Sequence, residues 1–115
     1  MTYIIDGIPP SNNRYIGRDA RWAYREAKRE WAALVRAAVG RNKPPKPFSR
    51  ARVVLTYYFP TRGRRDPDNY AGKMILDGLT AAGVLEDDSF DHIELILRGG
   101  YDKDRPRTEI EVEAG

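Results

Sequence analysis

Cysteine is absent from this sequence, and histidine occurs only once, as His92. The first absence excludes disulfides, thiolate metal sites and cysteine nucleophiles, and the second excludes a histidine-based triad or a multi-histidine metal site within one chain. A metal ion would therefore be held by oxygen ligands. No apolar run approaches the ~20 residues that span a bilayer, and Asp6 and Gly7 interrupt the start of the chain, where a signal peptide would be apolar. We expect a soluble, cytoplasmic protein with no membrane partner.

A chain of 115 residues is long enough for one hydrophobic core and too short for two, so we expect a single domain over residues 1–115. The formal net charge is only +3, but the charges are unevenly distributed. Residues 1–65 hold 15 Lys and Arg against 4 Asp and Glu, whereas residues 66–115 hold 5 against 13. A basic half therefore meets an acidic half between Arg65 and Asp66, and this boundary calls for a functional explanation.

The hydrophobic pattern predicts the element order β-α-β-α-β-β. A long amphipathic helix over residues 20–39 would begin after an N-cap at Asp19 and end at Gly40, and the β-branched and aromatic run 52–59 is typical of a central strand. The other predicted elements are a strand at 3–5, a helix at 67–82, and strands at 93–97 and 108–112 separated by a polar turn at 99–106. This order favours a two-layer α+β fold, in which two helices cover one face of a four-stranded mixed sheet.

Two carboxylates flank a proline at the start of the second predicted helix. Because the residue before a proline is extended, Asp66 and Asp68 are expected to point to the same side. A hard cation such as Mg²⁺ takes one or two carboxylates, and water and phosphate oxygens complete its shell. The alternative is purely structural, with Asp66 as the N-cap of the helix and Pro67 at its first position.

Basic side chains surround this acid pair. Arg62, Arg64 and Arg65 immediately precede it and could hold a phosphate backbone. Lys73 lies four residues before Asp77, so it either stabilises negative charge developing on a phosphate or forms an ordinary exposed ion pair. A basic stripe on the first predicted helix either contacts phosphates or is a solvated face, and it consists of Arg21, Arg25, Lys28 and Arg29.

A second acid pair, Asp87 and Asp88, follows the second predicted helix and leads into a strand. Adjacent side chains in a strand point to opposite faces, so one member of the pair could point at the site. Taken alone, the pair is typical of a turn. Aromatic side chains could stack on bases opened at a DNA junction, but we expect Trp31 and alternate residues of 57–59 to be core, and His92 receives no role.

Together these residues resemble a known family. The stretch RDPDN at 65–69, then Lys73 and Asp77, and then AGVLEDD at 82–88 are similar to the signature of the RusA family of Holliday-junction resolvases. The segment PPSNNRY at 9–15 is similar to the family's N-terminal loop, so the resemblance covers nearly the whole chain. Acids, amide and lysine recur at fixed spacing over roughly twenty residues, which a lone D-x-D would not do. One departure is Phe90, at a position where the family often has glutamine.

The resemblance implies a RusA-like fold and a homodimeric, Mg²⁺-dependent endodeoxyribonuclease that makes paired incisions in four-way DNA junctions, with Mn²⁺ as a substitute metal. It implies that Asp66, Asp68 and Asp88 bind the metal and that Lys73 completes the catalytic set, while the membership of Asp87 and Asp77 stays open. The expected DNA contacts are Arg62, Arg64, Arg65, Asn69, Asn12, Asn13 and Arg14.

A symmetric junction suits an isologous dimer with one active site per protomer, and apolar positions left over on the sheet or the first helix are expected to form its interface. Two other functions stay open on the sequence alone. One is a less selective nuclease of branched DNA with the same metal site. The other is a non-catalytic DNA-binding module in which the acids only cap helices and face solvent.

Overall fold

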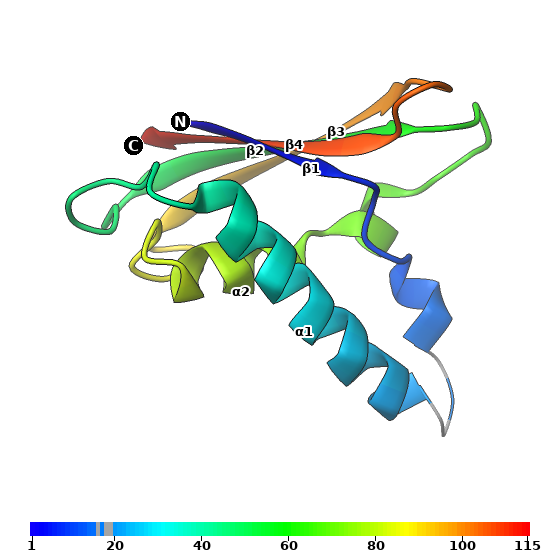
Figure 1. Cartoon of the computed structure of the whole chain (residues 1–115), viewed down its shortest axis with the longest axis horizontal. Coiled ribbons are helices and arrows are strands. Elements are labelled where there is room, and N and C mark those ends of the chain that lie inside the picture. The colour runs from blue at the N-terminus through cyan, green and yellow to red at the C-terminus, as the bar shows by residue number, and fades with distance from the viewer. Residues whose placement is uncertain (16, 18–19) are drawn as a thin grey trace.

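The computed structural model describes residues 1–15, 17 and 20–115. Four strands form one sheet in the order β1-β4-β2-β3, and two helices cover one of its faces (Figure 1). The strands are β1 (Thr2–Asp6), β2 (Ala51–Phe59), β3 (Ile93–Tyr101) and β4 (Arg107–Ala114); the helices are α1 (Ala20–Val39) and α2 (Lys73–Ala81), with short 3-10 helices η1 (Asn12–Tyr15) and η2 (Pro67–Tyr70). The predicted α+β fold is confirmed.

β2 is the central strand that its sequence predicts. It pairs in parallel with β3 and antiparallel with β4, so the sheet is mixed. Both of its neighbours are long, and the backbone groups of β2 are therefore satisfied on both sides. Its alternate residues Val53, Leu55, Tyr57 and Phe59 are buried under the helices.

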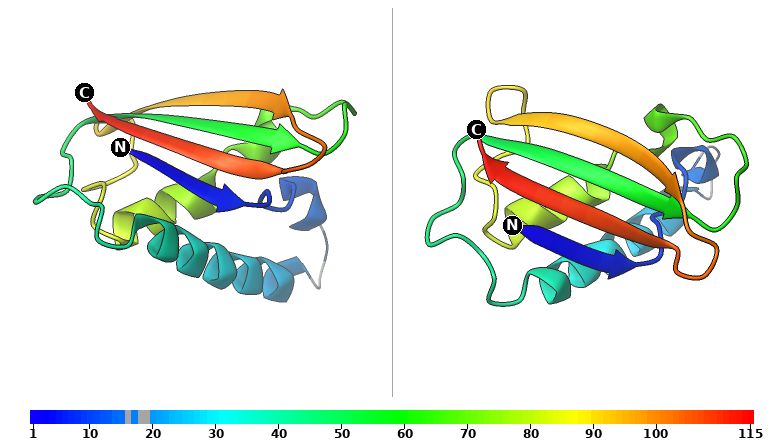
Figure 2. Two further views of the ribbon diagram at one scale, coloured as in Figure 1. Left: turned by 45° about the horizontal axis from the view of Figure 1, so that its top comes forward. Right: turned by 90° about the horizontal axis from the view of Figure 1, so that it is seen from above.

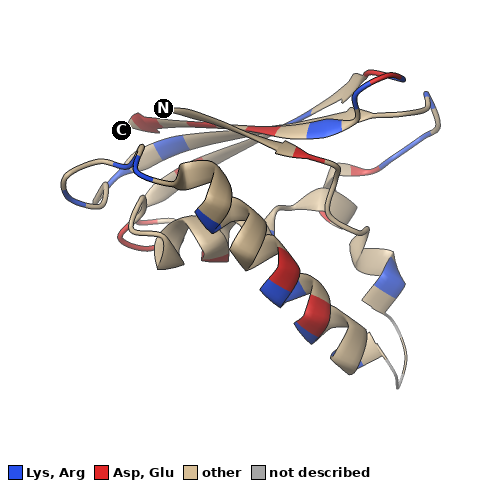
Figure 3. Cartoon of the chain, in the orientation of Figure 1, with Lys and Arg blue, Asp and Glu red and all other residues tan. Residues whose placement is uncertain are grey.

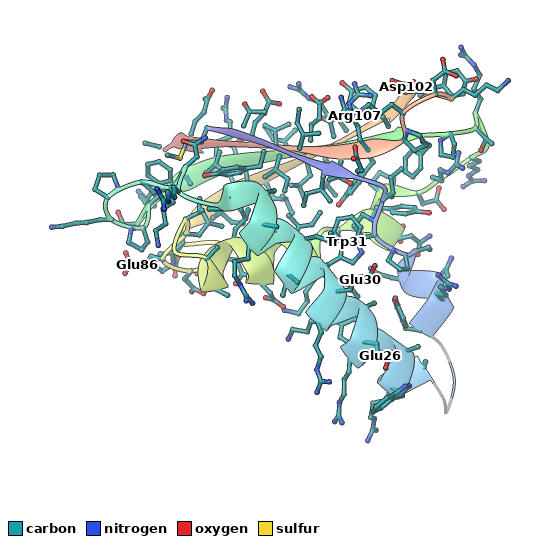
Figure 4. All side chains as sticks on the ribbon, viewed as in Figure 1. Glu26, Glu30, Trp31, Glu86, Asp102 and Arg107 are labelled. Atoms are coloured by element: carbon teal, nitrogen blue, oxygen red, sulfur yellow. The ribbon has the colours of Figure 1, made fainter. Side chains whose placement is uncertain are left out.

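Helix α1 buries one stripe of residues four apart, Ala27, Trp31, Val35 and Val39. This is the spacing of one helix face, and Figure 4 shows Trp31 pointing from α1 toward the sheet. The helix ends as predicted at Gly40, which has φ +51° and whose N–H bonds to the Arg36 carbonyl. The predicted N-cap, Asp19, lies outside the described residues.

The second helix differs from its prediction over 67–82. The chain forms η2, breaks at Ala71 and Gly72, and begins α2 only at Lys73. Gly72 has φ +83°, a conformation that L side chains rarely adopt, and a Cβ there would collide with Leu55 Cδ1. Residues on both sides of the break contact the core, so the apolar spacing through residues 70–79 continues across it. For this reason the break is not visible in the sequence.

The last two strands are longer than predicted. Gly99, Gly100 and Tyr101 were expected in a turn but extend β3, because they pair with Tyr57, Tyr58 and Phe59 of the long strand β2. A Cβ at Gly100 would lie 2.8 Å from the Tyr58 ring, so this glycine permits close packing within the sheet. The turn between β3 and β4 is correspondingly shorter.

Strand β4 separates apolar from acidic side chains. Thr108, Ile110 and Val112 are buried beneath the helices, whereas Glu109, Glu111 and Glu113 alternate with them and lie on the open face of the sheet. In Figure 3 both acidic and basic positions are marked along the strands of the sheet. No helix in the described part of the chain is long and apolar enough to cross a bilayer.

Candidate nuclease site

An aromatic cluster fixes the segment that carries the first acid pair. The Tyr70 ring of η2 packs against Phe59 with ring centroids 5.2 Å apart and against Tyr57 at 5.8 Å. Both partners come from the carboxyl end of β2, so η2 is held over the end of the central strand. Aromatic pairs in this range attract beyond their buried area, by about 0.5–1.5 kcal/mol each. The short 3-10 helix is therefore positioned by the core.

Asp66 immediately precedes η2 and is extended, with φ −99° and ψ 135°. Its side chain makes no capping hydrogen bond, although Pro67 occupies the first helical position. Instead the Arg64 guanidinium lies 3.3 Å from Asp66 Oδ1, and both side chains are at least half exposed. Asp66 therefore does occupy the N-cap position before Pro67, as the structural alternative holds, but its carboxylate caps no backbone N–H and stays accessible to a ligand.

Asp68 is exposed and lies inside η2. The expectation that Asp66 and Asp68 point to one side assumed an extended run through both residues, and the helical turn at Pro67 removes that basis. What the structure retains is two neighbouring carboxylates with accessible oxygens at one end of the sheet.

The three arginines of the preceding loop have different roles. Arg65 donates to the Thr61 and Gly63 carbonyls, and its guanidinium lies 4.4 Å from the Phe59 ring centroid, so it organises the loop. Arg62 lies over the Tyr101 ring at 4.2 Å. Arg64 extends into solvent with 89% of its side chain exposed. In Figure 3 the basic loop leads directly into the acidic segment.

The N-terminal loop lies against the same segment. Asn12 Nδ2 donates to the Asp68 carbonyl at 3.2 Å, which joins η1 to η2. A small hollow between them is lined by Pro9, Pro10, Asn12, Asn69, Lys73 and Tyr57, among others. The structure therefore brings together Asn12, Asn69 and Lys73, three of the residues expected in the site. Asn13 and Arg14 are exposed on η1.

Lys73 is at the first position of α2 and makes the ordinary ion pair that its spacing permits. Its Nζ lies 3.5 Å from Asp77 Oδ1, while Asp77 Oδ2 lies 3.5 Å from Lys28 Nζ of α1. Asp77 is thus shared by two lysines and links the two helices. An exposed pair of this kind contributes only about 0–1 kcal/mol, so little opposes a swing of Lys73 toward a phosphate.

The second acid pair lies elsewhere. Asp87 is 3.6 Å from His92 Nδ1, and its pKa is lowered mainly by a hydrogen bond from the Asp88 backbone N–H, with help from Ser89 and His92. Asp88 lines a hollow with Leu76 and the start of β3, whereas Asp66 lines another with Leu97 and Gly99 near its end. Figure 2 shows the two acid-bearing loops at opposite ends of the sheet. Within the described residues, no three His, Asp or Glu side chains form a group that could hold a metal ion.

Two residues near Asp66 were not picked out from the sequence. Arg98 lines the same hollow as Asp66 and adds positive charge to it. Tyr57 was expected to be core and is buried, but its hydroxyl has no hydrogen-bond partner among the described residues, and burial raises its pKa so that it stays protonated. Arg98 is the only basic residue of β3, and this is the one signal that could have found it.

A comparison with protein-family models matches residues 6–113 to endodeoxyribonuclease RusA. The chain therefore belongs to the RusA family. No curated protein matches it. The chain is therefore a nuclease. Its family consists of endonucleases that resolve Holliday junctions, and the substrate of the family is branched DNA. The expected resemblance is confirmed, and it spans the acids, the lysine and the N-terminal loop together.

The RusA-family chemistry calls for a divalent metal, and the donor set can be tested against one. The candidate ligands are all carboxylate oxygens, the type that hard cations take; Asp66 and Asp68 are both exposed, and the Asp66 side chain makes no capping bond. A cation of this kind needs only one or two protein carboxylates when phosphate oxygens and water complete its shell. The pair Asp66 and Asp68 therefore fits a metal that is bound together with DNA.

Proposed function

We propose that this RusA-family chain is a Mg²⁺-dependent resolvase that cuts four-way DNA junctions by paired phosphodiester hydrolysis. It acts as a homodimer inside the cell, with residues 1–115 as one nuclease domain and with Mn²⁺ able to replace Mg²⁺. The observation that carries the proposal is the family match over residues 6–113, which includes every residue assigned to the site.

Asp66, Asp68 and Asp88 are the proposed metal ligands, and because Asp88 lies at the other end of the sheet from Asp66 within one chain, they would meet across the homodimer. The bound metal would supply an activated water and neutralise charge on the phosphate oxygens. Lys73 places a further positive charge beside that phosphate once it leaves Asp77, from which it is 3.5 Å away. Removal of one such stabilising charge typically lowers a rate by about 10²–10³.

The proposed DNA contacts surround the acid pair. Arg64 reaches into solvent and is the leading phosphate contact of the loop, with Arg62 and Arg65 beside it. Asn69, Asn12, Asn13 and Arg14 contribute from η2 and η1. Contacts of this kind position the backbone and carry no base sequence, which suits an enzyme that recognises a branched shape.

The test is cleavage of a synthetic four-way junction with and without Mg²⁺, comparing the native chain with Asp68→Asn. We expect Asp68→Asn to lose at least about 100-fold in cleavage rate while still binding the junction, since removal of a carboxylate also removes repulsion from phosphate. The matched control is Asp104→Asn, an exposed aspartate in the turn between β3 and β4, which should cut normally. Normal cutting by Asp68→Asn would contradict the assignment.

Two other functions are distinguished by the same assay. Equal cutting of a four-way junction, a flap and a linear duplex would indicate a less selective nuclease with the same metal site. Binding without any Mg²⁺-dependent cleavage would indicate a non-catalytic DNA-binding module.

A further inference from the structure

The amino end of α2 begins without a side-chain cap. The N–H group of Leu76 bonds to the Gly72 carbonyl, so the three N–H groups before it, those of residues 73–75, have no acceptor within the helix. An N-cap side chain would ordinarily accept from one of them, but Gly72 occupies that position and has no side chain. A Cβ there would collide with Leu55, which keeps a capping serine or aspartate out. The helix therefore presents its first donors and the positive end of its dipole uncapped.

The Tyr57 hydroxyl lies at the same place. Tyr57 is only 3% exposed, and its hydroxyl has no hydrogen-bond partner among the described residues. It lies 3.3 Å from the position that a Cβ of Gly72 would take, directly beside the start of α2. Proteins rarely keep a buried polar group unsatisfied, because its desolvation is then not repaid by a hydrogen bond. A buried hydroxyl beside uncapped N–H groups indicates that a ligand completes the site.

The hydroxyl and the helix end share the small hollow between η1 and η2. Its lining includes Tyr57, Gly72 and residues 73–75, together with Asn12 and Asn69 from the two 3-10 helices. Its cavity volume is about 20 Å³, and roughly 10–15 Å³ is enough for one water-sized group. One oxygen atom of a ligand can therefore enter, while the rest of the ligand stays outside the hollow.

The groups around this hollow select an anion. Among the described residues no Asp or Glu lines it, whereas Asp66 lines the neighbouring hollow. Burial raises the pKa of Tyr57, so its hydroxyl stays protonated and can donate alongside the N–H groups. Lys73 also lines the hollow and brings a full positive charge. Converging donors, a helix dipole and a cation together suit a phosphate oxygen.

The hollow is a neighbour of the acid pair and separate from it. Tyr57 and Tyr70 line both this hollow and the one beside Asp66, so the two aromatic side chains form the wall between them. Successive phosphates of one DNA strand are close neighbours as well. A strand that places one phosphate at Asp66 can therefore place the next one at the start of α2.

We propose that the amino end of α2 and the Tyr57 hydroxyl together bind a non-bridging oxygen of a DNA phosphate, next along the strand from the phosphate that Asp66 and Asp68 address. The choice of a phosphate follows from the geometry, and its assignment to junction DNA rests on the proposed function. Tyr57 is then a DNA-binding residue as well as part of the core, and it holds the strand in register with the acids.

Inorganic phosphate tests the pocket without DNA. In a ¹⁵N-labelled sample at constant ionic strength, added phosphate should shift the amide resonances of residues 73–75 with a saturable curve. In Tyr57→Phe the same shifts should need roughly 10- to 100-fold more phosphate, the range for one hydrogen bond to a charged group. Shifts that do not saturate would indicate an adventitious ion only, and the absence of shifts would indicate a hollow that holds only water. Either result, or equal curves for the two proteins, would overturn the pocket.

Tyr3→Phe is the matched control for Tyr57→Phe. Tyr3 is equally buried, at 2% exposed, but its hydroxyl donates to the Asn42 carbonyl. Tyr3→Phe should therefore lower Tm, whereas Tyr57→Phe removes a hydroxyl without a partner and should keep or raise it. Binding of a synthetic four-way junction without Mg²⁺ should show the reverse order, with Tyr57→Phe roughly 10- to 100-fold weaker and Tyr3→Phe unchanged. Native junction binding by Tyr57→Phe would contradict the proposal.

Neutral phosphates identify the source of the oxygen. A methylphosphonate that replaces one phosphate of the junction removes its charge, and we move it along the strand around the cut. At one position beside the cut it should weaken binding by the native chain and leave binding by Tyr57→Phe unchanged. If Tyr57→Phe loses as much as the native chain at every position, the hydroxyl does not contact a DNA phosphate.

The outcomes separate this inference from the proposed function. If the native chain cuts junctions with Mg²⁺ and Tyr57→Phe binds and cuts them equally well, the resolvase function stands and the phosphate pocket is wrong. If the native chain does not cut junctions but phosphate shifts the amides of residues 73–75 only when the Tyr57 hydroxyl is present, the pocket stands and its assignment to junction DNA falls with the proposed function.

Discussion

Gly72 should be far less tolerant of alanine than Gly83, although the two glycines have the same φ of +83°. An alanine at either position carries the left-handed backbone penalty of about 1–2 kcal/mol. At Gly83 the added Cβ meets only the flexible Lys43 side chain, at 3.8 Å and beyond. At Gly72 it collides with the buried Leu55 side chain and lies 3.3 Å from the Tyr57 hydroxyl.

The collision at Gly72 is an overpacking of the core, which typically costs a further ~1–3 kcal/mol. Gly72→Ala is therefore expected to lower the free energy of unfolding by about 2–5 kcal/mol, against about 1–2 kcal/mol for Gly83→Ala. For a chain of this size, each kcal/mol corresponds to about 4 °C in Tm. We expect Tm to fall by about 8–20 °C and 4–8 °C respectively.

The assay is thermal and urea unfolding followed by far-UV circular dichroism, with both variants beside the native chain. The difference between the two variants isolates the steric contact, since the backbone strain is common to both. Equal destabilisation of the two variants would refute the reasoning, because it would mean that the break between η2 and α2 does not press against the core.

Two further predictions concern charged side chains. Arg64→Ala should weaken junction binding and reduce the slope of the logarithm of the binding constant against log salt by ~0.9. The control, Arg36→Ala on α1, should leave the slope unchanged. An unchanged slope for Arg64→Ala would mean that the loop does not contact DNA. Arg107 donates to Asp102 and Glu109, and its guanidinium holds the pKa of the Asp102 carboxyl below the usual 3.8. A lowered folded-state pKa adds stability above the unfolded value that is lost as pH falls, so the native chain should lose unfolding free energy below about pH 4 more steeply than Arg107→Met. Parallel acid profiles from chemical denaturation would contradict this.

Much of the fold follows from local patterns. The four-residue spacing of Ala27, Trp31, Val35 and Val39 predicts α1 with its buried face, and the β-branched run of β2 predicts a central strand. These elements are long and strongly periodic, and the tertiary structure keeps them as predicted. The break at Gly72 and the extension of β3 through Gly99 and Gly100 could not be predicted, since both depend on neighbours distant in sequence.

The sequence likewise predicted which chemical groups the site uses, but it did not predict how they are arranged in space. The absence of cysteine and the single histidine left only oxygen ligands for a metal, and the spacing of the acids, amide and lysine indicated the RusA family, which the family match confirmed. The roles of these residues stay predictions.

Only the tertiary structure decided where those acids lie. It placed Asp66 and Asp68 beyond the carboxyl end of β2 and Asp88 near the start of β3, at opposite ends of the sheet. The physical reason is topological. Because β2 and β3 are parallel, the segment that contains α2 must run back along the sheet, so residues at its two ends are separated by nearly the length of a strand.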